Sequence, residues 1–159
     1  MRMYDKKLDK YIGKKFNHGE SDCYSLIREF YKDEFGLELT DYARPDYWWN
    51  NGGNLYMDNF RNEGFRLLGD NEELQYGDVL LIALGCSVAS HGAIYIGNNL
   101  ILQHCQNHIS SIDRYMGVFK DRTLAKVRHK SIAEKGKVGY ELNEDSIYKF
   151  TKFVHNKRK

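Results

Sequence analysis

The most regular apolar pattern in the chain lies between residues 23 and 36. Six side chains recur there at helical spacing and share one face: Cys23, Leu26, Ile27, Phe30, Tyr31 and Phe35. Ser21 or Asp22 can cap the first free amides, and Gly36 is a natural stop. The pattern predicts an amphipathic helix that begins at Cys23 and turns its cysteine face inward.

Farther along the chain, the spacing changes to runs that are typical of strands. Residues 79–84 form a continuous apolar run, which suits a strand buried on both faces. Residues 91–96 and 100–104 predict a β-hairpin, and residues 124–129 predict another strand. We expect one domain over residues 1–130, followed by a linker and a C-terminal amphipathic helix within residues 131–159.

The turn of this hairpin decides which side chain shares a face with His91. With a two-residue turn at residues 98–99, His104 becomes the diagonal neighbour of His91, at about 7–8 Å. With a three-residue loop at residues 97–99 the parity flips, and Gln103 takes that place. The sequence leaves both open, and we favour the two-residue turn because asparagine tolerates positive φ.

A loop rich in aromatic residues follows the cysteine helix. Residues 41–53 combine a proline with asparagines and glycines, and they carry Tyr47, Trp48 and Trp49. Exposed rings of this size are costly unless they pack or bind something. The loop therefore either packs on the core or forms a cleft wall or a docking patch for a partner.

Composition narrows the classes of protein that fit. The 159 residues carry a net charge of +2 and 42% hydrophobic residues, which indicates a soluble globular domain and gives no argument for nucleic-acid binding. The sequence has no apolar run long enough for a membrane span, and its N-terminus lacks the apolar core of a signal peptide. Three cysteines without tight spacing argue against a disulfide framework. We expect a protein made and kept in a cytoplasm.

A cysteine at a helix start and a histidine at a strand start suggest thiol chemistry. The positive end of the helix dipole favours the nucleophilic thiolate of Cys23. His91 would take the thiol proton and return it to the leaving amine, and a third polar group would hold its ring. The alternative is a purely structural role, in which Cys23 is only a small core residue.

Three segments resemble the NlpC-type papain-like cell-wall cysteine peptidases, in particular their phage branch: residues 21–31, 75–81 and 91–97. The resemblance implies an α+β papain-like fold, with the cysteine helix packed on an antiparallel sheet. It also implies a phage tail-associated peptidoglycan hydrolase that acts during tail assembly or genome entry. Such a thiol endopeptidase would cleave stem peptides at a bond of the γ-D-glutamyl–diamino acid type.

The resemblance also assigns roles by position. Cys23 becomes the nucleophile and His91 the base, with His104 as the favoured third member and Gln103 as the alternative. Asp22 matches a position that helps to hold the substrate amine, and Tyr24 stands where many relatives have a small residue that contacts substrate. The expected partners are the stem peptide and phage tail tip proteins, and no cofactor is implied. The expected location is the host cytoplasm during assembly and the tail of the virion.

Two other interpretations stay open. The first is a metal site with ligands drawn from Cys23, His91, His104, Cys105 and His108, although no CxxC spacing supports it. The second is a non-catalytic structural component of the phage tail tip that keeps the fold for assembly. In that case the two tryptophans would be contact residues.

Overall fold

The computed structural model describes residues 3–50 and 53–133. Two short 3₁₀-helices, three α-helices and six strands are found there. In chain order they are η1 (Lys6–Tyr11), α1 (Cys23–Phe35), η2 (Trp48–Asn50), α2 (Leu55–Asn59), β1 (Phe65–Leu67), β2 (Val79–Ile82), β3 (His91–Tyr95), β4 (Leu100–Gln103), β5 (Ser111–Arg114), α3 (Val118–Asp121) and β6 (Thr123–His129).

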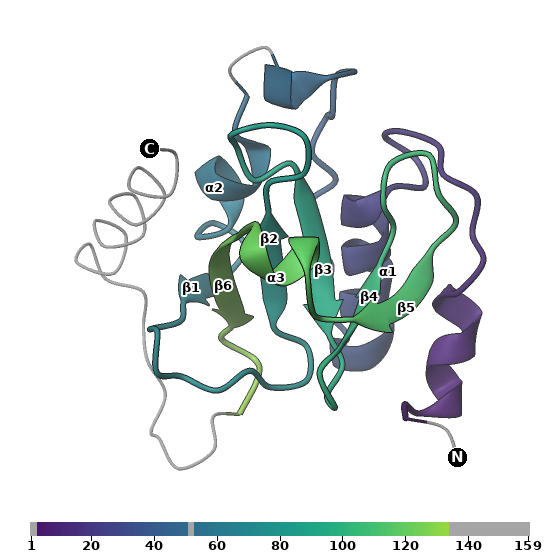
Figure 1. The fold of residues 1–159 in the computed structure, drawn as a ribbon, viewed down its shortest axis with the longest axis vertical. Coiled ribbons are helices and arrows are strands. Elements are labelled where there is room, and N and C mark those ends of the chain that lie inside the picture. The colour runs from purple at the N-terminus through teal and green to yellow at the C-terminus, as the bar shows by residue number, and fades with distance from the viewer. Residues whose placement is uncertain (1–2, 51–52, 134–159) are drawn as a thin grey trace.

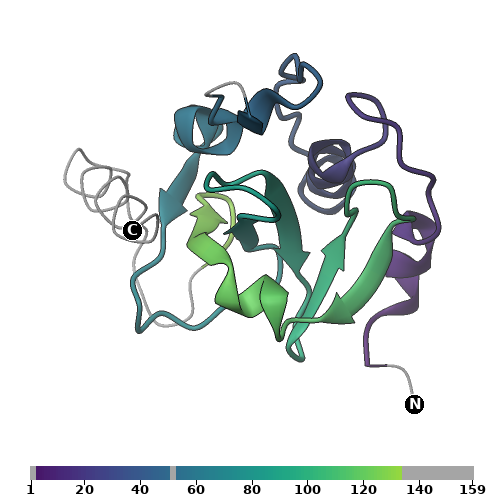
Figure 2. The same ribbon diagram turned by 45° about the horizontal axis from the view of Figure 1, so that its top comes forward.

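The strands form one antiparallel sheet in the order β1-β6-β2-β3-β4-β5. α1 lies along β3 on one side of the sheet, and α3 lies on the other side (Figures 1 and 2). This arrangement of helices on an antiparallel sheet is the predicted α+β papain-like fold. The N-terminal end of α1 and the start of β3 lie at the same end of the molecule (Figure 1). Because α1 begins at Cys23 and β3 at His91, the candidate nucleophile and base come to one region.

Helix α1 has the predicted start and stop. The Asp22 side chain accepts a hydrogen bond from the Ser25 amide, and Gly36 ends the helix in the left-handed conformation, with a φ of 66°. An N-cap of this kind contributes about 1 kcal/mol to stability. The buried stripe of the helix includes Ile27 and Phe30, which are at most 2% exposed. The helix is therefore fixed at both ends and along one face.

The sheet is buried on both faces at its centre. One face joins α1 in the larger core, which contains Val79, Leu81 and Ile94. The other face holds a smaller cluster around Leu80 and Ile82, against which the α3 side chain Phe119 packs. All four residues of β2 are buried, which confirms the strand predicted from the continuous apolar run.

The hairpin prediction is confirmed, but the predicted turn is wrong. Ile94 pairs with Leu102, and Ile96 and Leu100 close a three-residue loop at residues 97–99. All three loop residues adopt positive φ, between 52° and 89°. A two-residue turn does not fit this register, so the side chains of β4 face opposite to the favoured expectation.

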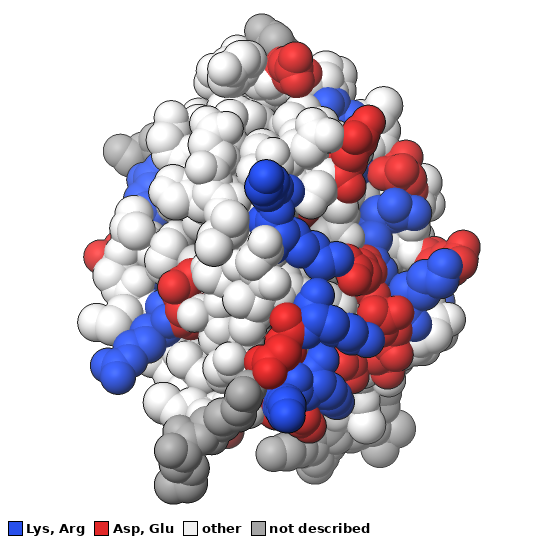
Figure 3. Space-filling model, turned by 90° about the vertical axis from the view of Figure 1, so that its right-hand side faces the viewer, with Lys and Arg blue, Asp and Glu red and all other residues white. Residues whose placement is uncertain are grey.

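The surface around η1 and α1 carries both signs of charge in close mixture (Figure 3). Representative pairs are Lys7–Glu34 at 3.0 Å and Lys10–Asp33 at 3.1 Å. Such intermingling leaves no broad field of one sign on this face. Within residues 3–50 and 53–133, none of the helices has the length and the apolar composition that a membrane span requires. The predicted linker and C-terminal helix lie almost entirely outside the described residues.

Candidate active site

Cys23 is the first residue of α1 and one of the residues that line a cleft at the N-terminal end of this helix. Its Sγ lies 3.0 Å from the hydroxyl oxygen of Tyr56, which α2 supplies. The backbone of β3 also comes close, because residue 92 is a glycine. A Cβ atom there would lie 2.8 Å from the Tyr56 hydroxyl and 2.7 Å from Ile27 Cδ1. The thiol is therefore held between α1, α2 and the start of β3.

The surroundings of Cys23 favour the protonated thiol. Burial raises the pKa of the Cys23 thiol, and the negative charge of Asp22 raises it further. The Tyr56 hydroxyl, the Gly92 amide and the Arg44 charge oppose this shift without cancelling it. The thiolate stabilisation expected from the helix dipole is thus outweighed. A partner that can remove the proton is required before the sulfur becomes a strong nucleophile.

Asp22 is buried and fully engaged at the helix start. Its carboxylate accepts hydrogen bonds from the amides of Gly19 and Ser25, at 2.8 and 2.9 Å, and from Arg44 Nε at 2.7 Å. Burial alone would raise the pKa of Asp22, but the Ser25 amide and the Arg44 guanidinium outweigh burial and lower it. Asp22 is therefore a structural anion that anchors Cys23, and it also lines the cleft.

His91 lies at the first position of β3, and its ring is held by β4. Its Nε2 atom lies 3.0 Å from Gln103 Oε1. A carbonyl oxygen can only accept, so Nε2 carries the hydrogen, and the neutral ring keeps its lone pair on Nδ1. His91 is 4% exposed and lines the same cleft as Cys23. Cys23 and His91 thus line one cleft, and Nδ1 is the ring nitrogen that the contact with Gln103 leaves available.

Gln103, and not the favoured His104, is the side chain that holds His91. The physical reason is the three-residue loop, which places Gln103 on the same face of the hairpin as His91 and turns His104 to the opposite side. His104 packs edge-on against Phe16, with ring centroids 5.3 Å apart. Its Nε2 atom is buried without a hydrogen-bond partner among the described residues, and burial lowers the pKa of its ring. His104 lines the cleft as a neutral imidazole.

Aromatic side chains form the outer walls of the cleft. Trp48 and Trp49 both line it, as does His18, whose Nε2 atom donates to the Arg44 carbonyl at 2.8 Å. Tyr47 instead points to solvent with 58% of its surface exposed. The aromatic loop thus combines the two predicted uses, because Trp48 joins the core while the same ring forms part of a cleft wall.

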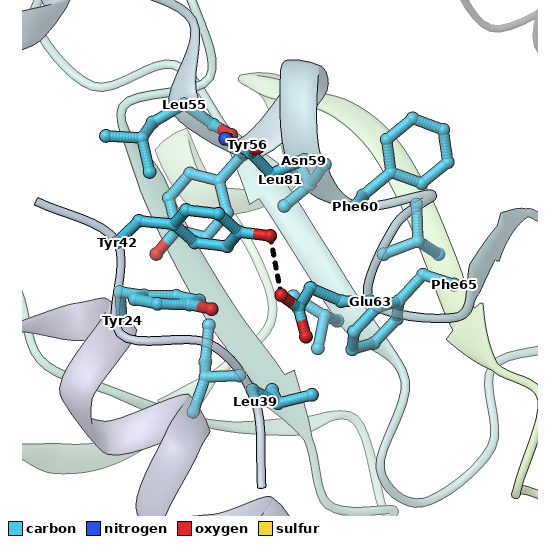
Figure 4. Close-up of a pocket in the computed structure, with 13 residues that line it drawn as sticks. Tyr24, Leu39, Tyr42, Leu55, Tyr56, Asn59, Phe60, Glu63, Phe65 and Leu81 are labelled. Carbon is cyan, nitrogen blue, oxygen red and sulfur yellow. Dashed lines mark hydrogen bonds between the residues drawn. The ribbon is translucent and has the colours of Figure 1, made fainter.

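Tyr24 lies between the cleft and a second, mainly apolar cavity of about 30 Å³. Figure 4 shows Tyr24 and Tyr42 on one side of this cavity, with Phe60 and Phe65 on the other. Among the residues that line this cavity, the Tyr42 hydroxyl donates a hydrogen bond to Glu63. The Tyr24 hydroxyl donates to the Thr40 carbonyl at 2.6 Å, which fixes the orientation of the ring. The ring therefore forms a wall shared by the cleft and the apolar cavity.

The residues of the metal interpretation are not gathered into a ligand set. Within residues 3–50 and 53–133, no three His, Cys, Asp or Glu side chains are placed to hold one ion. Cys105 Sγ lies 3.9 Å from His91 Nε2, the nitrogen that already faces Gln103. His108 is exposed and contacts the Gln106 carbonyl. The donors present therefore give no support to a metal-dependent site.

Sequence reasoning missed Tyr56 and Arg44. Tyr56 reaches the thiol from a helix 33 positions away, and Arg44 reaches Asp22 from a loop 22 positions away. Neither residue belongs to a local motif, so spacing alone gave no signal. An indirect signal was the glycine directly after His91, since a missing Cβ in a buried strand marks a close approach of other groups.

Comparisons with known proteins agree with this architecture. The chain is 40% identical over 119 residues to the tail tip assembly protein K of Escherichia phage lambda, which covers 75% of this chain. It is 32% identical over 117 residues to the tail tip assembly protein K of Escherichia phage N15, which covers 72%. The matched region amounts to 59% and 47% of those two proteins. The NlpC/P60 family model matches residues 13–128, which include Cys23, His91 and Gln103, and the chain therefore belongs to the NlpC/P60 family.

Proposed function

We propose that this protein is a cysteine endopeptidase that cleaves the stem peptides of peptidoglycan. One observation carries the proposal: a cysteine at a helix start and a histidine held by a glutamine line the same cleft. Membership of the NlpC/P60 family supports it. The proposed roles are nucleophile for Cys23, general base for His91 and orienting group for Gln103, which replaces the favoured His104.

In the proposed reaction, His91 Nδ1 takes the proton of the Cys23 thiol as the sulfur attacks the scissile carbonyl. Gln103 Oε1 accepts from Nε2 and stabilises the imidazolium that results. The imidazolium then protonates the leaving amine, and a thioester remains on the sulfur. Water, deprotonated by His91, hydrolyses the thioester and regenerates the thiol.

The first turn of α1 supplies donors for the oxyanion. The Cys23 and Tyr24 amides have no intrahelical acceptor, because they precede the first complete turn. The Asp22 carboxylate accepts its capping hydrogen bond from the Ser25 amide, which is the third residue of the helix. This cap therefore does not occupy the amides of Cys23 and Tyr24. Preorganised amides of this kind typically contribute about 3–4 kcal/mol to stabilisation of the transition state.

The finer assignments rest on the resemblance to phage relatives. We assign the scissile bond to the γ-D-glutamyl–diamino acid type. We also propose that the protein acts during tail assembly or genome entry, and the names of the two relatives, which are tail tip assembly proteins, support the first of these stages. The expected partners are tail tip proteins. The expected sites of action are the host cytoplasm during assembly and the virion tail.

Digestion of purified muropeptides, followed by mass spectrometry, tests the proposal. The wild-type protein should release products whose masses identify the cleaved bond, and the folded Cys23→Ala variant should release none. The Cys86→Ala variant is the matched control, because that cysteine contacts the Val88 carbonyl outside the cleft. A folded wild-type protein that leaves every muropeptide intact would refute the catalytic proposal and favour the assembly role.

A further inference from the structure

The hydrogen bonds that hold His91 extend beyond Gln103 to side chains of strand β5. The Gln103 amide nitrogen Nε2 donates to Asp113 Oδ2 at 2.9 Å, while its Oε1 atom faces His91 Nε2 at 3.0 Å. Ser111 Oγ donates to the same carboxylate oxygen at 2.6 Å. The pairing of Gln103 with Ser111 places these side chains on one face of the sheet. A continuous chain of hydrogen bonds thus runs from the edge strand to the cleft.

We propose that Asp113 is a positioning residue that fixes the tautomer of His91 through Gln103. A glutamine amide has two nearly isosteric ends, and a flip exchanges its donor and its acceptor. An ionised carboxylate can only accept, so Asp113 requires the NH₂ end of Gln103. The carbonyl end must then face His91, and its Nε2 atom must carry the hydrogen.

The consequence for His91 follows from its two nitrogens. With the hydrogen on Nε2, the lone pair lies on Nδ1 and can accept a proton. If Gln103 flips, its NH₂ group donates to Nε2, and the hydrogen moves to Nδ1. A neutral ring in that state has no free lone pair for the thiol. Asp113 therefore acts without touching substrate, by excluding the unproductive arrangement.

This inference uses the role that the proposed function gives to His91, but its test does not require cleavage. Long-range ¹H–¹⁵N correlation spectra of the imidazole nitrogens distinguish the two neutral tautomers. A His91→Gln variant assigns the signal of this ring among the six histidines of the chain. The wild-type ring is expected to be in the Nε2–H form.

Asp113→Ala removes the acceptor that fixes the amide. The ratio of Nε2–H to Nδ1–H tautomer at His91 should fall by about tenfold. Arg114→Ala is the matched control, because Arg114 is the next residue on β5 and its side chain is exposed. The control should keep the wild-type signals, which separates the effect from a general loosening of the edge strand.

Asp113→Asn provides a second variant of nearly the same shape if the alanine variant fails to fold. An asparagine can donate as well as accept, so it no longer excludes the flipped amide. The same shift of tautomer is expected, with smaller amplitude. Unchanged His91 signals in a folded Asp113 variant would overturn the inference, as would a wild-type ring in the Nδ1–H form.

The two proposals fail in different ways. If wild-type protein cleaves muropeptides, kcat should fall by about tenfold or more in Asp113→Ala, with KM little changed. If it cleaves none while the tautomer still depends on Asp113, the proposed function fails and the positioning role stands. If it cleaves and the tautomer ignores Asp113, only the positioning role fails.

Discussion

Breaking the ion pair between Arg44 and Asp22 should be strongly destabilising, because both charges are buried. Both side chains are only 4% exposed, and Nε lies 2.7 Å from Oδ2. The remaining guanidinium donors are also occupied, by Asp41 and the Tyr42 carbonyl on one side and by the Gly19 carbonyl and Ser25 on the other. The Arg44→Met substitution would keep the length of the side chain but leave the Asp22 carboxylate buried and without its charged partner.

The expected cost follows from that burial. Removing one partner of a buried ion pair typically costs about 3–5 kcal/mol, because the other charge stays desolvated. A domain of this size is stabilised by only about 5–15 kcal/mol in total. At about 2–4 °C per kcal/mol, the melting temperature should fall by about 6–20 °C.

Urea denaturation and thermal melts of Arg44→Met measure this cost. Lys32→Met is the matched control, because Lys32 pairs with Glu38 while 66% and 77% of the two side chains remain exposed. A surface pair of that kind contributes about 0–1 kcal/mol. If Arg44→Met were no more destabilising than Lys32→Met, the account of Asp22 as a buried anion anchored by Arg44 would be wrong.

Three further predictions concern the same helix start. Gly92→Ala should destabilise the fold by about 1–3 kcal/mol in urea denaturation, because its Cβ would lie 2.7 Å from Ile27 Cδ1, and wild-type stability would contradict the close packing. The fold lowers the pKa of Asp22 below its ordinary 3.8, so its contribution to stability is fully present above that value and is lost as pH falls from there through the lower pKa of the folded protein. The difference in unfolding free energy between wild type and Asp22→Asn should therefore shrink from about pH 6 to about pH 3, and a constant difference would argue against the shift. Tyr56→Phe removes a hydroxyl that lowers the pKa of Cys23, so alkylation of this thiol near neutral pH should slow by about tenfold, whereas unchanged kinetics would deny the contact.

The sequence predicted the elements whose formation depends on neighbouring residues along the chain. The helix over Cys23–Phe35 and its two ends follow from spacing, a capping carboxylate and a glycine, and all are confirmed. The buried strand Val79–Ile82 and the hairpin after it follow from apolar runs in the same way. These elements carry Cys23 and His91, so the candidate nucleophile and base could be named from the chain alone.

Long-range contacts and the loop of the hairpin could not be predicted in this way. One extra residue in the loop reverses the parity of β4, and the sequence permits either loop because glycine and asparagine both tolerate positive φ. That single residue decides between Gln103 and His104. The contacts of Tyr56 with Cys23 and of Asp113 with Gln103 depend on how distant elements pack, which no local pattern encodes.

The most direct test of the account is the rate at which iodoacetamide alkylates Cys23 as a function of pH, in wild type and in His91→Gln. Peptide mapping by mass spectrometry separates Cys23 from Cys86 and Cys105. If His91 serves as the base for this thiol, the wild-type rate near neutral pH should exceed that of the variant by about tenfold or more. Superimposable pH profiles in two folded proteins would contradict the pairing of Cys23 with His91.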